Sequence, residues 1–478
     1  MEKKKGLTLS DKISYVLLAA GIGIFVTGIG LIRNPDHDSF FLIDLGRYIV
    51  NNRALPKTAY WLITDDVPTI VQQWMCDVCN YIAYALGGYT GLVILGIIFD
   101  LILLACMFIY CRELFKNIRT ALTASVFLWL FLNEFTNTRP FSITISVALL
   151  ELTVLHRFFS KEEHTKREIR IFFVLIAALF IFQVNWQASN ILFPVFWLLC
   201  YIPFVKEDRM SIRPGINLYA LAALGTGIVS SLINPNGIHG TLYLFYSRGS
   251  LKGFNIFECR PPALWSGYTL MMAMIIALLV YAAFKRRLTA AQFLLSAGCI
   301  FMSVLYMRCC WTLVLPLAQL LSGFDLFGKK EKWVRWGIIA ACILSVNLIF
   351  RYRDEKTDDL QKMLDCVPAP DKVTLYTDFN SGAYFLIDGY KIYFDARPEL
   401  YHKYIAGSKA FTQEALDAWT GDIDYGKFIE KYGFDWFAVS TDSKMEYYLE
   451  SEPDYEFVFE NEDDGIAVYR RIPEQVSP

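Results

Sequence analysis

Eleven long apolar runs follow one another through the first 350 residues, and they constrain the fold more than any other feature. A helix needs about 20 apolar residues to cross the ~30 Å hydrocarbon core of a bilayer, so each run is a candidate span. The runs are 13–32, 91–110, 120–133, 140–156, 170–185, 188–204, 216–233, 266–284, 290–306, 310–326 and 335–350. The sequence therefore predicts a polytopic α-helical membrane protein with about 11 transmembrane helices.

Charge is divided unequally along the chain. From Asp354 to the end there are 27 acidic and 12 basic residues, which leaves 20 acidic and 33 basic residues in 1–353. The change predicts a domain boundary, with a membrane domain at 1–353 and an acidic soluble domain at 354–478. Neither the acidic domain nor basic clusters that topology explains indicate binding to nucleic acid.

Lys and Arg are concentrated in alternate connections between the apolar runs. The clusters are Lys3–Lys5, Arg112 with Lys116 and Arg119, Arg157 with Lys166, Arg167 and Arg170, Lys206 with Arg209 and Arg213, Lys285–Arg287, and Lys329, Lys330, Lys332 and Arg335. Because cytoplasmic loops are enriched in basic residues, we expect a multi-pass plasma-membrane protein with a cytoplasmic N-terminus. An odd number of spans then makes 354–478 extracytoplasmic.

The first external loop, 34–75, is expected to carry amphipathic helices, one of them over Phe40–Ile49. Residues 75–88 would reverse the order of all later loops if they crossed the membrane. We therefore interpret 75–88 as an amphipathic helix at the membrane surface.

Two aspartates, Asp36 and Asp38, stand where the chain leaves the first apolar run. A carboxylate there can serve as a general base for a substrate hydroxyl. The pair is also a candidate oxygen-ligand set for a divalent cation such as Mg²⁺ or Mn²⁺. The alternative is local, since Asp38 or Ser39 would cap a helix beginning near Phe40.

The remaining candidate substrate-binding residues also lie in predicted external connections. Arginine matches phosphate bidentately and keeps its charge, so an arginine cluster suits a phosphate or diphosphate group, although each arginine alone is equally explained by snorkelling to lipid headgroups. Tryptophans can stack a sugar ring, or form the interfacial aromatic belt. The candidates are Arg139, Arg260, Arg308, Glu258, His239, Trp74 and Gln187.

After residue 353 the pattern changes to short β-type runs. Strands are predicted at 373–377, 383–387, 391–395 and 435–440, a hairpin at 455–459 and 466–470 around NEDDG, and helices at 411–418 and 424–432. The result would be a small α/β domain with mixed strands. It has no glycine-rich phosphate loop and no nucleophile elbow, so we expect it to cover or gate the membrane site.

These features together resemble the GT-C superfamily of membrane glycosyltransferases, and more narrowly a bacterial subgroup of GT-C-like membrane proteins. The first loop, DHDSFFLIDLGRYIVNNRALP, carries the aspartates, the G-R-x-I motif and the Leu-Pro. The other matching segments are Trp74 with GGYTGL at 87–92, Arg139-Pro140, N-P-x-G at 234–237, Glu258 before Pro261-Pro262, and D-x-R-x-E-L-Y at 395–401.

The resemblance implies a polyprenyl-phosphate-linked sugar as donor and a glycan, lipid or protein as acceptor. The donor phosphate would bind near Arg139, Arg260 and Arg308. Asp38 or Asp36 would deprotonate the acceptor hydroxyl, and the sugar would be transferred with inversion. In the soluble domain, Asp395, Arg397 and Glu399 are expected to form a structural group of ion pairs.

Three alternatives stay open at this point. A lipid-linked glycan polymerase or ligase would use a large external loop, for which 234–265 is the candidate. A transporter would carry ionisable residues near helix midpoints or internal repeats, whereas we expect the ionisable residues at helix ends and find no repeat. A non-catalytic accessory protein would keep the GT-C fold without the activity.

Overall fold

The computed structural model describes residues 9–32, 38–64, 67–115, 117–132, 135–136, 138–204, 215–247, 257–285, 287–322, 336, 356–394, 397, 400 and 409–473. Its contacts divide the chain into two compact units. The membrane unit comprises Met1–Arg33, Val93–Asn234 and Phe257–Arg353, and the sheet unit comprises Asn34–Leu92, Pro235–Ile256 and Asp354–Pro478. The first loop therefore belongs with the C-terminal residues, across the predicted boundary at 353/354.

Helices occupy ten of the eleven predicted apolar runs, and the run at 335–350 lies outside the described residues apart from residue 336. They are α1 (Leu9–Ile32), α3 (Trp74–Leu114), α4 (Ile118–Leu132), α5 (Phe141–Phe159), α6 (Lys166–Trp186), η2 (Ala188–Ile191) with α7 (Leu192–Tyr201), α8 (Leu218–Ser230), α11 (Gly267–Phe284), α12 (Ala290–Leu305), and η5 (Met307–Leu313) with α13 (Val314–Ser322). Four of them, α3, α5, α6 and α11, are long and apolar enough to cross a membrane, and six shorter apolar helices accompany them. The protein is a multi-pass membrane protein, and the count of eleven spans stays a prediction.

The helix α3 contains the predicted surface helix and the next span in succession. Its helical geometry breaks at Gly87 and Gly88, and Gly88 adopts a φ of 56°. That left-handed conformation favours glycine because it has no Cβ. The break confirms that 75–88 is a separate helical segment from the apolar run at 91–110.

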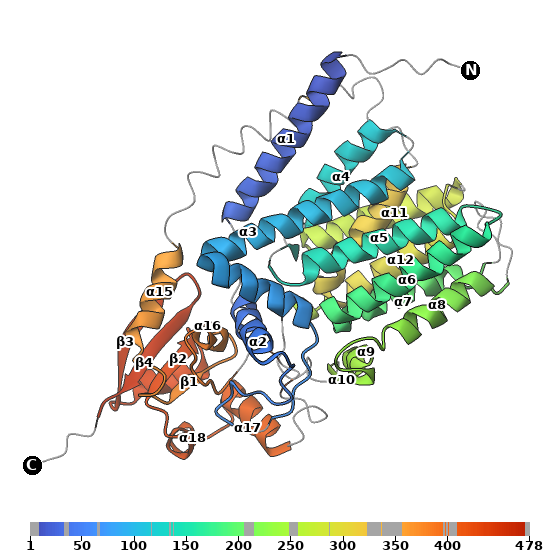
Figure 1. Cartoon of the computed structure of the whole chain (residues 1–478). Coiled ribbons are helices and arrows are strands. Elements are labelled where there is room, and N and C mark those ends of the chain that lie inside the picture. Colours follow the sequence, from blue (N-terminus) through green and yellow to red (C-terminus); the bar gives the residue numbers. More distant parts are fainter. Residues whose placement is uncertain are drawn as a thin grey trace, which may run out of the picture. The chain divides into compact units, whose positions relative to one another are not determined.

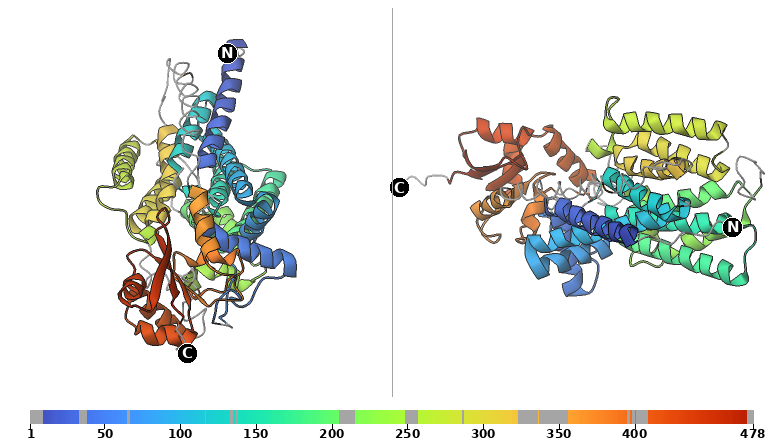
Figure 2. Two further views of the ribbon diagram at one scale, coloured as in Figure 1. Left: turned by 90° about the vertical axis from the view of Figure 1, so that its left-hand side faces the viewer. Right: turned by 90° about the horizontal axis from the view of Figure 1, so that it is seen from above.

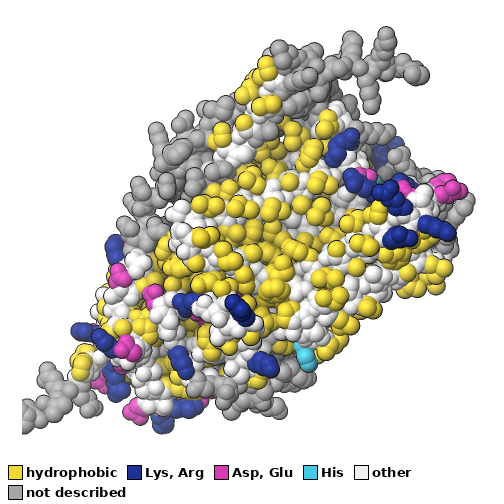
Figure 3. Space-filling model, in the orientation of Figure 1, with side chains coloured by type: hydrophobic (Ala, Val, Ile, Leu, Met, Phe, Trp, Pro, Cys, Tyr) yellow, Lys and Arg dark blue, Asp and Glu magenta, His cyan; other side chains and the backbone are white. Residues whose placement is uncertain are grey.

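Within the membrane unit, α5, α6, α7 and α8 pack on one another, as do α11, α12 and α13, and these helices run side by side in Figures 1 and 2. Two capping boxes fix where helices begin, Thr165 with Glu168 at α6 and Thr289 with Gln292 at α12. Apolar side chains cover the outer face of α3 and α6, as Figure 3 shows. A face of this kind is suited to lipid.

Charged groups mark one end of these helices. Arg157 Nε at the end of α5 donates to Glu113 Oε2 at the end of α3 over 2.6 Å. Phe158 stacks on Phe172 near the beginning of α6 at 3.9 Å. Arg139 directly precedes the other end of α5. The basic connection at 157–170 and the predicted external connection at 133–140 therefore lie at opposite ends of one helix.

A four-stranded mixed sheet forms the centre of the sheet unit, with strand order β1-β2-β4-β3. Its strands are β1 (Leu375–Thr377), β2 (Trp436–Ser440), β3 (Tyr455–Asn461) and β4 (Ile466–Arg471). β1 pairs with β2 in parallel, and β4 pairs antiparallel with both β2 and β3. The predicted hairpin and mixed sheet are confirmed, and Gly465 in the hairpin turn has a φ of 62°.

Two strand predictions in this unit are wrong. Residues 383–387 lie in and just after the helix α16 (Gly382–Leu386), which follows a turn where Asp378 accepts hydrogen bonds from the amides of Asn380 and Ser381. A short buried apolar run fits strand and helix equally well by periodicity. Among the described residues of 391–395, the chain makes only an isolated bridge from Ile392 to Leu62.

The helices of the sheet unit are α2 (Asp38–Asn52), α9 (Ile238–Thr241), α10 (Tyr243–Ser247), α15 (Lys356–Cys366), α16, α17 (Lys409–Thr420), α18 (Tyr425–Tyr432) and α19 (Lys444–Ser451). Helices α2, α17 and α18 confirm the predicted ones. Glu414 joins α17 to α18 by accepting hydrogen bonds from Lys431 and Tyr432. Burial alone would raise the pKa of Glu414, but these hydrogen bonds outweigh it, so the pKa lies below its usual range.

Candidate functional site

Asp38 is the first residue of α2 and is half-buried. An acidic side chain in the first turn of a helix is favoured by the partial positive charge of the free amides there. Asp38 can thus cap α2 and also act as a general base, because a residue at a helix start can point its carboxylate at a ligand. Asp36 and His37 lie outside the described residues.

The helix α2 packs directly against the first part of α3. A Cβ added to Gly46 would lie 2.1 Å from the carbonyl oxygen of Asp77 and 2.6 Å from the Cβ of Tyr81. Only glycine permits this approach, which explains the glycine of the G-R-x-I motif. Near the start of α2, Phe40 makes an edge-to-face contact with Tyr384 of α16 at 4.9 Å.

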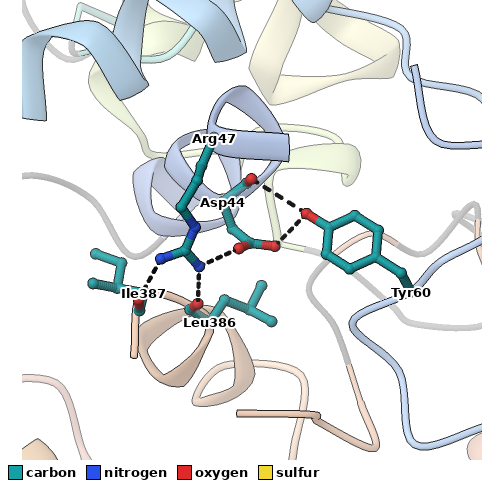
Figure 4. Close-up of polar contacts among 5 residues, drawn as sticks. All are labelled: Asp44, Arg47, Tyr60, Leu386 and Ile387. Carbon is teal, nitrogen blue, oxygen red and sulfur yellow. Dashed lines mark hydrogen bonds and ion pairs between the residues drawn. The ribbon is translucent and has the colours of Figure 1, made fainter. Parts of the chain in front are cut away.

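A polar network joins α2 to α16, as Figure 4 shows. Arg47 Nη1 donates to the carbonyl of Ile387 over 2.8 Å, and Nη2 donates to that of Leu386 over 3.0 Å. The same Nη2 lies 2.5 Å from Asp44 Oδ1, and the Tyr60 hydroxyl donates to Asp44 Oδ2 over 2.7 Å. Burial and the Asp44 carboxylate raise the pKa of Tyr60, so Tyr60 stays a neutral donor.

Arg397 reaches the same loop from the C-terminal part of the sheet unit. It is 8% exposed, and its guanidinium carbon lies 4.0 Å from the ring centre of Trp61 and 4.7 Å from that of Phe41. The planar cation is thus stacked against first-loop aromatic rings. Asp395 and Glu399, its predicted ion-pair partners, lie outside the described residues.

Trp74 and His239 belong to the same unit as Asp38. Trp74 is half-buried at the first position of α3, and His239 is exposed on α9 with its ring 5.8 Å from that of Tyr246. A hydrogen bond of 2.8 Å from Asn236 Nδ2 to the carbonyl of Val71 ties the chain before α9 to the first loop.

The predicted arginines and Glu258 come together in the membrane unit. Arg139 Nη1 lies 3.9 Å from Glu258 Oε1, and the Arg139 side chain is 17% exposed. The short helix η4 (Phe257–Cys259), which carries Glu258, contacts η5, which carries Arg308. The amide of Met307 donates to the carbonyl of Arg260 over 2.9 Å. We call Arg139, Glu258, Arg260 and Arg308 the arginine cluster.

The positive charge of Arg308 is weakly compensated by the described residues around it. Its guanidinium carbon lies 5.4 Å from the ring centre of Phe141, and among the described residues its Nη1 has one polar contact, with the weak acceptor Cys259 Sγ at 3.9 Å. Among the described residues no carboxylate forms an ion pair with Arg308. An anion that enters the cluster would therefore meet an unneutralised guanidinium.

Gln187 is buried among helix ends. Its Oε1 accepts hydrogen bonds from Thr144 Oγ1, over 2.9 Å, and from Asn190 Nδ2. Next to it, Trp186 Nε1 donates over 2.9 Å to the carbonyl of Pro140, the residue after Arg139. These bonds attach the start of α5 to the end of α6, and they fix the backbone that carries Arg139.

Two carboxylates inside the membrane unit were not foreseen. Glu151, near the middle of α5, is fully buried, and neither of its oxygens has a hydrogen-bond partner in the described part of the chain. Asp100 of α3 is 1% exposed. These two lie away from the helix ends, where the ionisable residues were expected to cluster. The signal was available, because a single acidic residue within an apolar run is costly and marks a special position.

The described residues contain no group of three His, Cys, Asp or Glu side chains arranged to hold a metal ion. Asp38 is the described member of the predicted pair. The divalent cation thus stays a prediction.

Solved structures show what this fold is similar to. ArnT from Cupriavidus metallidurans in the apo state aligns over 98% of this chain and 100% of its own, with a TM-score of 0.59 and 12% identity. The Archaeoglobus fulgidus oligosaccharyltransferase tethered with an acceptor peptide containing the NVT sequon aligns over 89% of this chain and 68% of its own, with a TM-score of 0.51 and 12% identity. Its complex with Zn and sulfate covers 96% and 74%, with a TM-score of 0.50 and 13% identity.

No protein-family model matches the chain, and the comparison with curated proteins finds no significant match. At 12–13% identity the similarity is one of fold. Together with the apolar helices, it confirms the predicted fold: the chain is folded like ArnT and this oligosaccharyltransferase, as the resemblance to the GT-C superfamily implied.

Proposed function

We propose that the protein is a membrane glycosyltransferase that moves a sugar from a polyprenyl-phosphate donor to an extracytoplasmic glycan, lipid or protein acceptor. The observation that carries the proposal is the arginine cluster at the helix ends of a GT-C fold, with Arg308 lacking a carboxylate partner among the described residues. A phosphate would supply the missing negative charge.

In this proposal the donor phosphate binds to Arg308 and Arg139, and its polyprenyl tail lies along the apolar helix faces. Arginine holds phosphate oxygens through paired N–H groups, and these interactions strengthen as negative charge grows on the leaving oxygen. The 3.9 Å separation of Arg139 and Glu258 is too long for a hydrogen bond, so an incoming phosphate competes with a weak ion pair.

Asp38 or Asp36 is the proposed general base. The acceptor hydroxyl gives its proton to the carboxylate as its oxygen forms a bond to the anomeric carbon. The bond from that carbon to the phosphate oxygen breaks, and its electron pair leaves with the polyprenyl phosphate. A single in-line displacement of this kind inverts the anomeric centre and needs one base and a stabilised leaving group.

The proposal includes the predicted topology, with a cytoplasmic N-terminus and the C-terminal residues outside, so that Asp38 and the arginine cluster face the same side of the plasma membrane. It also keeps Mg²⁺ or Mn²⁺ at Asp36 and Asp38 as a feature to be tested by adding a chelator. Glu258, His239, Trp74 and Gln187 remain proposed contributors to substrate binding.

The test is a binding and transfer assay with purified protein in lipid vesicles and a panel of synthetic polyprenyl-phosphate sugars. For Arg308→Gln we expect donor affinity to fall roughly 10- to 100-fold, as for loss of a charge-assisted hydrogen bond. The matched control is Arg157→Gln, at the opposite end of α5, which should bind donor normally. Equal affinities in wild type and Arg308→Gln, or failure to bind any member of the panel, would overturn the proposal.

A further inference from the structure

The C-terminal residues of the sheet unit are hydrogen-bonded to the first loop through the backbone, as parts of one scaffold are. The carbonyl of Trp61 accepts from the amide of Ile392 over 2.9 Å, and the amide of Ile63 donates to the carbonyl of Ile392 over 2.9 Å. Leu62 and Ile392 form a parallel bridge. One backbone segment of the first loop is therefore paired with the segment that leads to Arg397.

That leading segment is itself fixed by the sheet. Thr377 Oγ1 of β1 donates to the carbonyl of Phe394 over 3.1 Å, and a Cβ added to Gly382 would lie 2.2 Å from the same carbonyl oxygen. Residues 392–394 are thus held between β1, α16 and the first loop. Arg397 follows three residues later in the chain.

The Arg397 side chain then connects two parts of the first loop. Phe41 belongs to the first turn of α2, three residues after Asp38, and Trp61 belongs to the segment that follows α2. The guanidinium contacts both rings, at 4.7 and 4.0 Å, while being 8% exposed. Such a stack depends on the planar shape of arginine as well as on its charge, so lysine is no substitute.

A buried carboxyl group of α3 lies within electrostatic range of Arg397. Asp77 is fully buried in the first part of α3, its oxygens lack hydrogen-bond partners in the described residues, and it interacts electrostatically with Arg397. The backbone oxygen of Asp77 is also the atom on which Gly46 of α2 rests.

We propose that Arg397 is a positioning residue that fixes the N-terminal turn of α2, and with it Asp38, through its stack on Phe41 and Trp61. This inference rests on the proposed role of Asp38. The C-terminal domain then acts as part of the scaffold of the first loop, where the sequence led us to expect a cover or gate.

The experiment compares Arg397→Lys and Phe41→Leu with the matched control Arg470→Gln, in the full-length protein in lipid vesicles. Arg470 is a half-exposed arginine of the same sheet that pairs with Glu456. Hydrogen exchange of the amides in 38–49 is measured first, without substrate. We expect about 10-fold faster exchange in both test variants and no change in the control.

The second readout is the rate of sugar transfer, measured at a temperature at which all variants are folded. Misplacing a catalytic group by ~1 Å can cost about 100-fold in rate. We therefore expect kcat to fall roughly 10- to 100-fold in Arg397→Lys and Phe41→Leu, with the donor KM nearly unchanged. Unchanged exchange in 38–49 would overturn the positioning role. So would a rise in KM at constant kcat, which would make Arg397 a substrate contact. If exchange changes but wild type transfers no sugar, the positioning stands and the proposed function fails.

Discussion

Replacing Gly46 by Ala tests directly whether α2 is seated on the backbone of α3. The added methyl would lie 2.1 Å from the carbonyl oxygen of Asp77. Carbon and oxygen in contact lie about 3.3 Å or more apart, so the helices must separate by roughly 1 Å. Forced overpacking costs typically 1–3 kcal/mol, and because the obstacle is backbone the upper end applies. Alanine's better helix propensity returns about 1 kcal/mol, which leaves a net cost of about 2 kcal/mol.

A cost of about 2 kcal/mol corresponds to a roughly 30-fold larger open population, because 1.4 kcal/mol is a factor of ten. Hydrogen exchange with mass spectrometry on the protein in detergent should therefore show about 30-fold faster exchange of the α2 amides. The matched control is Gly23→Ala in α1, where an added Cβ meets nothing within 4 Å. If Gly46→Ala exchanges as slowly as wild type, α2 does not rest on α3 as described.

Three further changes have defined outcomes. Arg47→Gln leaves the buried Asp44 with Tyr60 as its remaining described side-chain partner. The stability of α2 should fall by about 2 kcal/mol, which is less than for a fully buried ion pair because Arg47 is part-exposed; unchanged hydrogen exchange of the α2 amides would contradict this. Glu414→Gln should destabilise α17 by about 1 kcal/mol at pH 7. Because the pKa of Glu414 is lowered, the difference from wild type should disappear as the pH falls through that lowered pKa; a constant difference across pH would refute the assignment. Glu151→Met replaces a buried carboxyl that has no hydrogen-bond partner among the described residues by an apolar side chain of similar volume. The melting temperature in detergent should therefore rise, and a lower one would mean that Glu151 has a partner.

The helices were predictable because a membrane-spanning helix requires a pattern that is visible in the sequence. A bilayer demands a continuous apolar run, and ten of the predicted runs coincide with helices. The hairpin was predictable for a similar reason, since β3 and β4 are separated by a turn whose glycine adopts a positive φ. In both cases the residues within the segment itself determine its structure.

The site could be predicted only in part, because its decisive contacts join residues far apart in the chain. The arginine cluster followed from loop parity, which puts Arg139 and Glu258 on one side of the membrane. Nothing in the sequence near Arg47 indicates that its partners are the carbonyls of Leu386 and Ile387, about 340 residues later. The glycine beside it, Gly46, was visible as a motif, but its reason is the backbone of α3.

The strand predicted at 383–387 failed for a related reason. Five apolar residues in succession say that a segment is buried, and they leave open whether it is a strand or a helix. The turn at Asp378, whose carboxylate caps the following amides, decides for the helix α16. A pattern of side-chain hydrogen bonds to the backbone outweighed β propensity here.

The most direct test of the account is the single-turnover rate of sugar transfer from a bound polyprenyl-phosphate donor in Asp38→Asn, Asp36→Asn and the double variant. The account predicts that at least one single variant and the double variant bind donor as wild type does, while transfer slows by about 100-fold or more, as for loss of a general base. Transfer at the wild-type rate by the folded double variant would contradict it.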